Sequence, residues 1–265
     1  MPLKPAEGLY SILPEDHRLP YEVEEILDRL LDREGREEFQ PDFAPEMYCI
    51  NARWDGHPVA VIGNRRGFVK AGGQPRIGGI VYTESARKVS YFVETAERLA
   101  RPLVYLQDVS GFMVGPEAEA SAIIRAGAEM VESMACATVP KIVLTLNHAS
   151  GAGYYAMAGQ GFDPNFCFAW PGARIGVMEG DSAVMAVHGP ELEKLKAAGQ
   201  PVPEELQARV EATRADYERW LDARHAAARG HVDALLDPFE TRRMISFALD
   251  CAAVRSSWLP TEAGA

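Results

Sequence analysis

The chain has 265 residues, of which 47% are hydrophobic and 25% charged, a composition typical of a soluble globular protein with one substantial core or two small ones. Its net charge of −11 argues against binding to nucleic acid or to an anionic membrane surface, although a local basic cluster could still bind a phosphate. The four scattered cysteines predict neither a disulfide nor a zinc or other metal site, and the lack of a signal pattern or of a run of about 18 apolar residues predicts a cytoplasmic protein.

The N-terminal part of the sequence predicts a lead-in, a helix and a hairpin. Residues 1–20 are rich in proline and glycine and should be extended. Residues 22–31 place apolar side chains at helical spacing, which predicts a short amphipathic helix. Two strands, 47–53 and 58–64, flank Asp55-Gly56, a strong signal for a β-hairpin.

The segment 64–79 is rich in glycine and predicts a loop. Its basic side chains form a conspicuous positive patch for so acidic a chain: Arg65, Arg66, Lys70 and Arg76. Solvated loop charges are the ordinary interpretation, and binding of phosphates or an adenine nucleotide tail is the functional one.

Helices and strands alternate from residue 80 to residue 188. Each predicted strand is a short apolar run that is followed by a loop containing glycine. The pattern is typical of a mainly parallel, buried sheet with helical crossovers, so the predicted fold class is α/β. The predicted helices cover 85–99, 117–137, 154–161 and a segment from 179, and the strands 102–108, 140–149, 166–170 and 174–178.

The stretch 140–158, PKIVLTLNHASGAGYYAMA, is central to the prediction. It begins as a buried strand, breaks at 150–153 and continues as a small-residue helix from about Tyr154. A glycine-rich turn between a strand and a helix presents backbone N–H groups at the positive end of the helix dipole. Such donors bind an anion or stabilise one that forms during a reaction. Because ligand sites lie at the carboxyl ends of parallel strands, the loop 110–115 should face the same cavity.

The C-terminal part is charged and helix-forming. Residues 189–230 predict a helical hairpin packed on the domain, without forming a second domain, and 244–254 predict a closing amphipathic helix. The tail 260–265 should be frayed. The chain is therefore expected to be a single domain, 1–265.

The glycine turn has three interpretations. Residues 151–156 fit the dinucleotide fingerprint G-x-G-x-x-G/A, but no acidic residue closes the next strand, where a ribose partner would be needed. An oxyanion hole made of two amide donors is the second interpretation and the favoured one. A tight turn with only a structural role is the third.

Other candidate residues also have alternative roles. Phe112, Met113 and Val114, between Gly111 and Gly115, form either a loop tip folded on the core or an apolar wall over a ligand ring or acyl chain. His148 could be a general base, but a lone histidine at a strand end is more often structural. Asp108 is expected to cap loop amides, with acid–base chemistry the less favoured role.

Four separated motifs resemble the biotin-dependent carboxyltransferase family. They are LQDVSGFMVG (106–115), IIRAGAEMVES (123–133), TVPKIVLTLNHASGAGYYAMAG (138–159) and AWPGARIGVMEGDSA (169–183). The family includes the β-subunits of propionyl-CoA and methylcrotonyl-CoA carboxylases and the α-subunit of glutaconyl-CoA decarboxylase. The segments 9–32, 63–68 and 192–206 look most like the decarboxylase. The resemblance implies a ClpP/crotonase-like fold of repeated β-β-α units, with a helical insertion near 190–230.

The resemblance also implies roles for individual residues. The amide-donor pair falls on Ala152 and Gly153, and Tyr155 occupies a place that the family uses for acyl selection. The expected biotin-binding residues are Gly111, Phe112, Met113, Val114, Gly115, Gly151 and Tyr154. Arg65, Arg66 and Lys70 are expected to bind the coenzyme A part of the substrate. Biotin would arrive on a separate carrier protein or domain.

One departure from the family is large. Family chains have two homologous domains, and this chain resembles only the C-terminal one. The resemblance therefore implies a separate N-terminal-type carboxyltransferase subunit, a biotin carboxyl carrier protein and a hetero-oligomer built from dimers or trimers. Two rivals stay open: a biotin-independent crotonase-fold acyl-CoA decarboxylase or hydratase, and a non-catalytic subunit that binds CoA.

Overall fold

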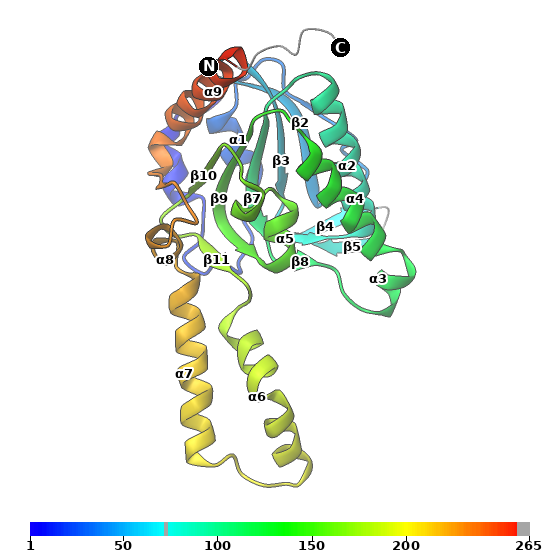
Figure 1. Ribbon diagram of the computed structural model, residues 1–265, viewed down its shortest axis with the longest axis vertical. Helices are drawn as coiled ribbons and strands as arrows, with labels where there is room; N and C mark the ends of the chain where they lie inside the picture. Colours follow the sequence, from blue (N-terminus) through cyan, green and yellow to red (C-terminus); the bar gives the residue numbers. More distant parts are fainter. Residues whose placement is uncertain (72–73, 259–265) are drawn as a thin grey trace.

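The computed structural model describes residues 1–71 and 74–258, and a single twisted sheet forms the centre of the molecule (Figure 1). Its strands run in the order β1-β2-β3-β7-β9-β10-β12, and β11 pairs with β9 further along that strand. The strand bounds are β1 Glu37–Glu38, β2 Met47–Trp54, β3 His57–Asn64, β7 Leu103–Val109, β9 Lys141–Ser150, β10 Phe166–Ala169, β11 Arg174–Gly176 and β12 Ala234–Leu235.

The sheet is mainly parallel, as predicted. β2 and β3 form the expected antiparallel hairpin, and Asp55 and Gly56 at its turn have φ angles of 52° and 87°. From β3 onward the neighbouring strands β7, β9, β10 and β12 are parallel. β7 and β9 are buried along their whole length, because helices or the lead-in cover both faces of the sheet.

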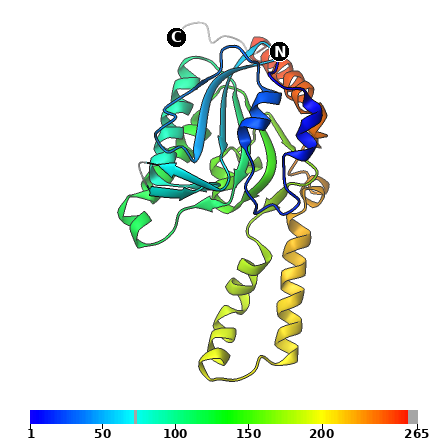
Figure 2. The same ribbon diagram turned by 180° about the vertical axis from the view of Figure 1, so that it is seen from behind.

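Each face of the sheet has its own core. On one face the helices α2 (Thr83–Arg98) and α4 (Ile123–Cys136) pack with Val89, Phe92 and Met130 against the strands. On the opposite face α1 (Val23–Leu30) and α9 (Thr241–Trp258) pack with residues such as Leu27 and Ile245. Figures 1 and 2 show these two layers from opposite sides.

Two segments differ from the sequence-based expectation. The predicted helix 117–137 is interrupted, because Ala122 adopts a left-handed conformation (φ 67°) that separates α3 (Pro116–Ala120) from α4. The predicted loop 64–79 contains a small antiparallel pair, β4 (Phe68–Ala71) and β5 (Gln74–Ile77).

Three further short elements complete this part of the chain. β6 (Ile80–Val81) pairs in parallel with β8 (Gly111–Phe112). β8 lies inside the segment 110–115, which was predicted as a loop. The lead-in includes a 3-10 helix, η1 (Ala6–Ser11), whose Leu9 is buried in the second core.

The helical hairpin projects from the domain instead of packing on it (Figures 1 and 2). Its helices, α6 (Gly180–Ala197) and α7 (Glu204–Leu221), pack on each other through a small core of Val184, Leu206 and Val210. The prediction of a packed hairpin was wrong because helical periodicity specifies an apolar face without specifying its partner, and here each helix supplies the partner for the other.

Three short helical elements remain. The 3-10 helix η2 (Gln160–Phe162) lies between α5 and β10, whereas α8 (Ala223–Ala228) follows the hairpin and the 3-10 helix η3 (Pro238–Glu240) precedes α9. The predicted frayed tail, 260–265, lies outside the described residues. Among residues 1–71 and 74–258, no helix combines the length and the apolar character that crossing a membrane requires.

Candidate functional site

The junction between β9 and the short helix α5 (Gly151–Ala156) forms the centre of the candidate site. β9 ends at Ser150 and α5 begins at the next residue, three positions before the predicted start at Tyr154. The left-handed conformation of Gly151 (φ 54°) makes so abrupt a change of direction possible. The first N–H groups of a helix have no intrahelical acceptor, and the side chain of Ser150 does not cap them.

Glycine at position 153 lets α5 lie against the loop that follows β7. A Cβ atom at Gly153 would be 2.6 Å from Val109 Cγ2 and 3.0 Å from Gly111 Cα. Ser110 and Ser150, one from each loop, line the same small cavity of about 280 Å³. The first residue of each loop therefore faces one cavity, as predicted, whereas Met113–Gly115 and Gly151–Ala152 line two different cavities.

A larger cavity, of about 860 Å³, opens on the other side of the junction. Gly151, Ala152 and Tyr155 line one wall, and the hairpin contributes Tyr217 and Trp220 to another. Tyr155 is half-exposed, and its ring packs edge-on against both Tyr154 and Phe162. The wall is mostly apolar, so the cavity can hold an acyl chain or a ring.

The apolar loop residues do not line this larger cavity. The ring of Phe112 packs on α4, where it lies 3.1 Å from the position that a Cβ of Gly127 would take. Met113, Val114 and Gly115 line a separate cavity of about 710 Å³ beside α3. Phe112 therefore packs on the core, the first of the two roles considered for this loop, whereas Met113 and Val114 form the wall of a neighbouring cavity.

Most of the predicted basic patch is engaged in ion pairs within the chain. Arg65, the residue after β3, donates to Glu38 on β1 at 2.8 Å and to Glu24 on α1 at 2.9 Å. Arg76 similarly contacts Glu46 and Glu84, both at 2.9 Å. The exposed Lys70 forms no ion pair within the part of the chain that the structure describes.

Asp108 is completely buried below the loop, where side chains surround its carboxylate. The Tyr21 hydroxyl donates to it at 2.8 Å, the Asn147 amide lies 3.3 Å from both oxygens, and Arg66 Nε lies 3.1 Å from Oδ2. Burial raises the pKa of Asp108 despite the opposing effect of Arg66. The prediction that Asp108 caps loop amides is wrong, because its carboxylate is surrounded by the side chains of Tyr21, Asn147 and Arg66.

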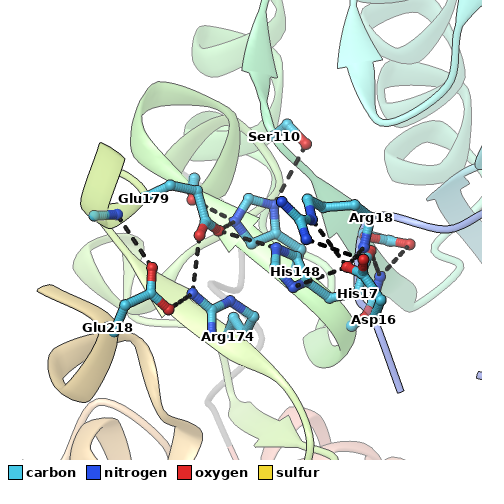
Figure 3. Close-up of polar contacts among 12 residues, drawn as sticks. Asp16, His17, Arg18, Ser110, His148, Arg174, Glu179 and Glu218 are labelled. Atoms are coloured by element: carbon cyan, nitrogen blue, oxygen red, sulfur yellow. Dashed lines mark hydrogen bonds and ion pairs between the residues drawn. The ribbon is translucent and has the colours of Figure 1, made fainter. Parts of the chain in front are cut away.

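His148 lies at the centre of a buried polar network (Figure 3). Its Nε2 is 2.9 Å from Glu179 Oε1 and 2.8 Å from Ser150 Oγ, and its Nδ1 is 3.4 Å from Ser110 Oγ. Only 4% of the residue is exposed. Burial alone would raise the pKa of Glu179, but its contacts with His148 and Arg174 hold that pKa at about 2, so the carboxylate is ionised.

The network extends to the lead-in and to the hairpin. His17 Nε2 lies 3.4 Å from Glu179, and burial lowers the pKa of His17. Arg174 on β11 donates to Glu179 at 2.8 Å and to Glu218 on α7 at 2.5 Å. Figure 3 shows these groups converging from the lead-in, β9, β11, the start of α6 and α7.

Sequence reasoning missed His17, Arg174, Glu179 and Glu218. Arg174 and Glu179 are five positions apart, but their other partners, His17, His148 and Glu218, are far from them in the sequence. An acidic residue before a helix also looks like an ordinary helix start. Within residues 1–71 and 74–258, no group of three or more His, Cys, Asp or Glu side chains is arranged to hold a metal ion.

Comparison with known proteins gives a consistent result. A model described as the carboxyl transferase domain matches residues 2–263. The β1 subunit of a biotin-dependent 3-methylcrotonyl-coenzyme A carboxylase from Mycobacterium tuberculosis is 36% identical over 253 residues, which are 95% of this chain and 45% of that protein. The mitochondrial methylcrotonoyl-CoA carboxylase β chain of Arabidopsis thaliana is 36% identical over 255 residues, 96% of this chain and 41% of that one.

Solved structures give the same result for the fold. The β subunit of Pseudomonas aeruginosa geranyl-CoA carboxylase superposes with a TM-score of 0.82 at 33% identity, covering 95% of this chain and 45% of that chain. The transcarboxylase 12S structure superposes with a TM-score of 0.82 at 29% identity, covering 95% of this chain and 46% of that chain. The predicted crotonase-like α/β fold is confirmed, and the chain spans about half the length of the curated relatives it matches.

Proposed function

The chain belongs to the carboxyl transferase domain family, and from this membership we propose that it is the carboxyltransferase subunit of a biotin-dependent acyl-CoA carboxylase or decarboxylase. The observation that carries the proposal is the match over residues 2–263, which includes the β9–α5 junction. Transfer of a carboxyl group between biotin and an acyl-CoA builds negative charge on oxygen atoms. The junction supplies backbone donors suited to such an oxygen.

The residues of the junction fit biotin. Gly151 and Ala152 line an apolar cavity that is large enough for a two-ring system, and the Ser150 hydroxyl contacts His148 instead of the α5 N–H groups. Bound biotin supplies the carboxyl group that is transferred. In this proposal the N–H groups of Ala152 and Gly153 donate hydrogen bonds to the ureido oxygen of biotin, on which negative charge develops. Fixed donors stabilise the transition state more than the ground state, by about 3–4 kcal/mol for each donor in comparable sites.

The neighbouring residues have supporting roles in the proposal. Gly111 belongs to the biotin site because Gly153 packs directly against it. Tyr154, whose hydroxyl accepts the N–H of Gln160 at 2.9 Å, fixes the orientation of α5. Tyr155 presents its half-exposed ring to the cavity and is proposed to select the acyl group.

The structure distinguishes among the three residues, Arg65, Arg66 and Lys70, that the sequence suggested for binding coenzyme A. Lys70 is exposed without an ion pair among the described residues, so it can bind a phosphate at no cost in internal contacts. Arg65 and Arg66 would first have to leave Glu38 and Asp108, respectively. We therefore propose Lys70 as the principal contact of the three.

The proposal includes partners. The relatives have a further half that this chain does not match, so the proposed partners are an N-terminal-type carboxyltransferase subunit and a biotin carboxyl carrier protein. A hetero-oligomer of dimers or trimers is proposed for the assembly, consistent with the hexamer named for the transcarboxylase 12S relative.

One observation favours a second candidate, a biotin-independent decarboxylase. The buried His148 and the half-buried Glu179 lie beside the junction and could return a proton to the substrate carbon after CO2 is lost. Avidin separates the two candidates. The native complex is isolated through a tag on this chain, and acyl-CoA carboxylation or decarboxylation is measured with and without avidin. Inhibition supports biotin dependence, whereas full activity in avidin contradicts it and supports the second candidate.

A further inference from the structure

A serine, a histidine and a glutamate form a chain of contacts along the cavity of about 280 Å³ (Figure 3). Ser110 Oγ is 3.4 Å from His148 Nδ1, and His148 Nε2 is 2.9 Å from Glu179 Oε1. The first distance is long, as catalytic hydrogen bonds often are before a substrate binds. A hydroxyl, an imidazole and a carboxylate in this order are the arrangement with which hydrolases activate a serine.

The charge of Glu179 determines which nitrogen of His148 is protonated. Burial alone would raise the pKa of Glu179, but its contacts with His148 and Arg174 hold that pKa at about 2. An ionised carboxylate repels a nitrogen lone pair, so the neutral imidazole has its proton on Nε2, the nitrogen that faces Glu179. Nδ1 then has the free lone pair, and it faces Ser110. In this tautomer His148 can accept the hydroxyl proton of Ser110.

Ser110 is open to solvent, unlike the other serine that contacts His148. Ser150 is only 4% exposed, and its Oγ lies 2.8 Å from Nε2, the nitrogen that already has a proton. Ser110 is exposed and lies on the side of the free lone pair. Arg66 donates to Ser110 Oγ at 3.1 Å, which fixes this oxygen and favours the negative charge that it gains on deprotonation. Ser110 is therefore the serine that His148 can activate.

The cavity beside Ser110 fits a small acyl group. Its volume of about 280 Å³ holds on the order of nine non-hydrogen atoms, at about 30 Å³ for each water-sized group. Arg18 and Ser182 line the same cavity, and Ser182 lies in the first turn of the 18-residue helix α6. N–H groups in the first turn of a helix have no intrahelical acceptor. These groups and the Arg18 guanidinium can stabilise a carbonyl oxygen that becomes negative.

We propose that Ser110, His148 and Glu179 form a catalytic triad that hydrolyses short-chain acyl esters or thioesters, an activity that goes beyond carboxyl transfer. Ser110 Oγ attacks the acyl carbon, and its proton passes to His148 Nδ1. The bond from the acyl carbon to the alcohol oxygen or thiol sulfur breaks, and His148 gives the proton to this leaving group. A water molecule then attacks the acyl-serine and gives a proton to His148, which returns it to Ser110 as the carboxylic acid leaves.

The purified whole chain, without biotin, carrier or partner, tests the proposal. Release of 4-nitrophenolate from 4-nitrophenyl acetate is measured above the uncatalysed rate. Ser110→Ala and His148→Gln should each lower the rate by about 10²-fold, and the double variant should lower it no further, because the two residues act as a unit. Ser11→Ala is the matched control, since Ser11 is an exposed serine whose hydroxyl donates to Gly8 O. This variant should keep the full rate.

Phenylmethylsulfonyl fluoride, a reagent that sulfonylates activated serines, identifies the nucleophile independently. Peptide mapping should place the label on Ser110 in the unmodified chain. Ser110 is exposed, so Ser110→Ala should leave the thermal melt unchanged while it removes both the label and the hydrolysis. Hydrolysis that is unchanged in Ser110→Ala, a label on Ser150 in place of Ser110, or no label would each overturn the proposal. The avidin experiment measures carboxyl transfer separately, so the failure of either proposal is distinguishable.

Discussion

At the scale of single residues, Ala152 and Gly153, the two small residues of the proposed donor pair, differ in the substitutions that they tolerate. Gly153 is buried against Val109 and Gly111, so any side chain there disturbs packing between the loops as well as the donor. Ala152 is exposed to the cavity, and its side chain can change without a steric clash with the core. Ala152 is therefore the position at which a donor can be removed cleanly.

We predict that Ala152→Pro lowers kcat of the assembled enzyme by about 10²–10³-fold, the effect of losing one oxyanion donor. Proline lacks the N–H group, yet it is tolerated in the first turn of a helix, where that group has no intrahelical acceptor. The measurement is steady-state kinetics beside a thermal melt. Ala152→Ser keeps the donor and serves as the matched control. If both variants retain full activity, Ala152 does not supply the catalytic hydrogen bond.

The sequence was sufficient to locate the junction that carries these residues, and insufficient to find the side chains around it. A glycine-rich break after a buried strand has a local pattern, so the β9–α5 junction could be located from residues next to one another. The Arg174–Glu218 and His148–Glu179 contacts join residues 44 and 31 positions apart, and no local pattern relates their partners. Asp108 was predicted as an amide cap for the same reason, since Tyr21 and Asn147 reach it only in the folded chain.

At the scale of elements, the α6–α7 hairpin is the most independent part of the fold. Its small core, Val184, Leu206 and Val210, is separate from the two cores of the sheet. Periodicity predicted both helices, but it could not show that they would face each other and project from the domain. The interrupted helix at Ala122 was also beyond prediction, because an alanine in the left-handed conformation has no sequence signal.

We predict that replacing residues 185–213 with a short Gly/Ser linker leaves the body of the domain folded. Helices packed on each other have axes about 8–10 Å apart, so a few residues can close the gap. The circular dichroism melt should shift by only a few degrees, because neither large core loses a side chain. Val210→Asp in the intact chain is the comparison, and it should expose α6 and α7 to proteolysis first. A collapse of the whole melt on excision would show that the sheet depends on the hairpin.

At the scale of the whole molecule, one buried carboxylate joins both ends of the fold. Asp32 accepts hydrogen bonds from the N-terminal amino group at 2.7 Å, from the Gly56 N–H at 2.8 Å and from Arg242 on α9 at 2.6 Å. Burial opposes ionisation of this carboxyl, but these contacts outweigh it and lower the pKa of Asp32 to about 2. The carboxylate therefore links the lead-in, the β2–β3 turn and the last helix.

We predict that protonation of Asp32 lowers the free energy of unfolding as the pH falls. The folded-state pKa of Asp32 is below the unfolded value of 3.8, so its contribution is complete above about pH 4 and is lost as the pH falls toward 2. Urea denaturation at pH 6 and pH 3 measures the loss. Asp32→Asn should be less stable than the unmodified chain at pH 6 and should lose less stability between the two pH values. Equal losses in both proteins would rule Asp32 out as a source of acid sensitivity.

The separate core of the α6–α7 hairpin has a consequence for how such a protein can diversify. One wall of the large cavity, Tyr217 and Trp220, belongs to a segment that folds on itself, whereas the opposite wall belongs to the sheet and α5. Insertions, deletions and exchanges in the hairpin can accumulate without disturbing the strands that hold Ala152 and Gly153. The lining of the cavity and the β9–α5 junction can then change at different rates, and chimeras that exchange only this hairpin between relatives would measure how far it determines what the cavity binds.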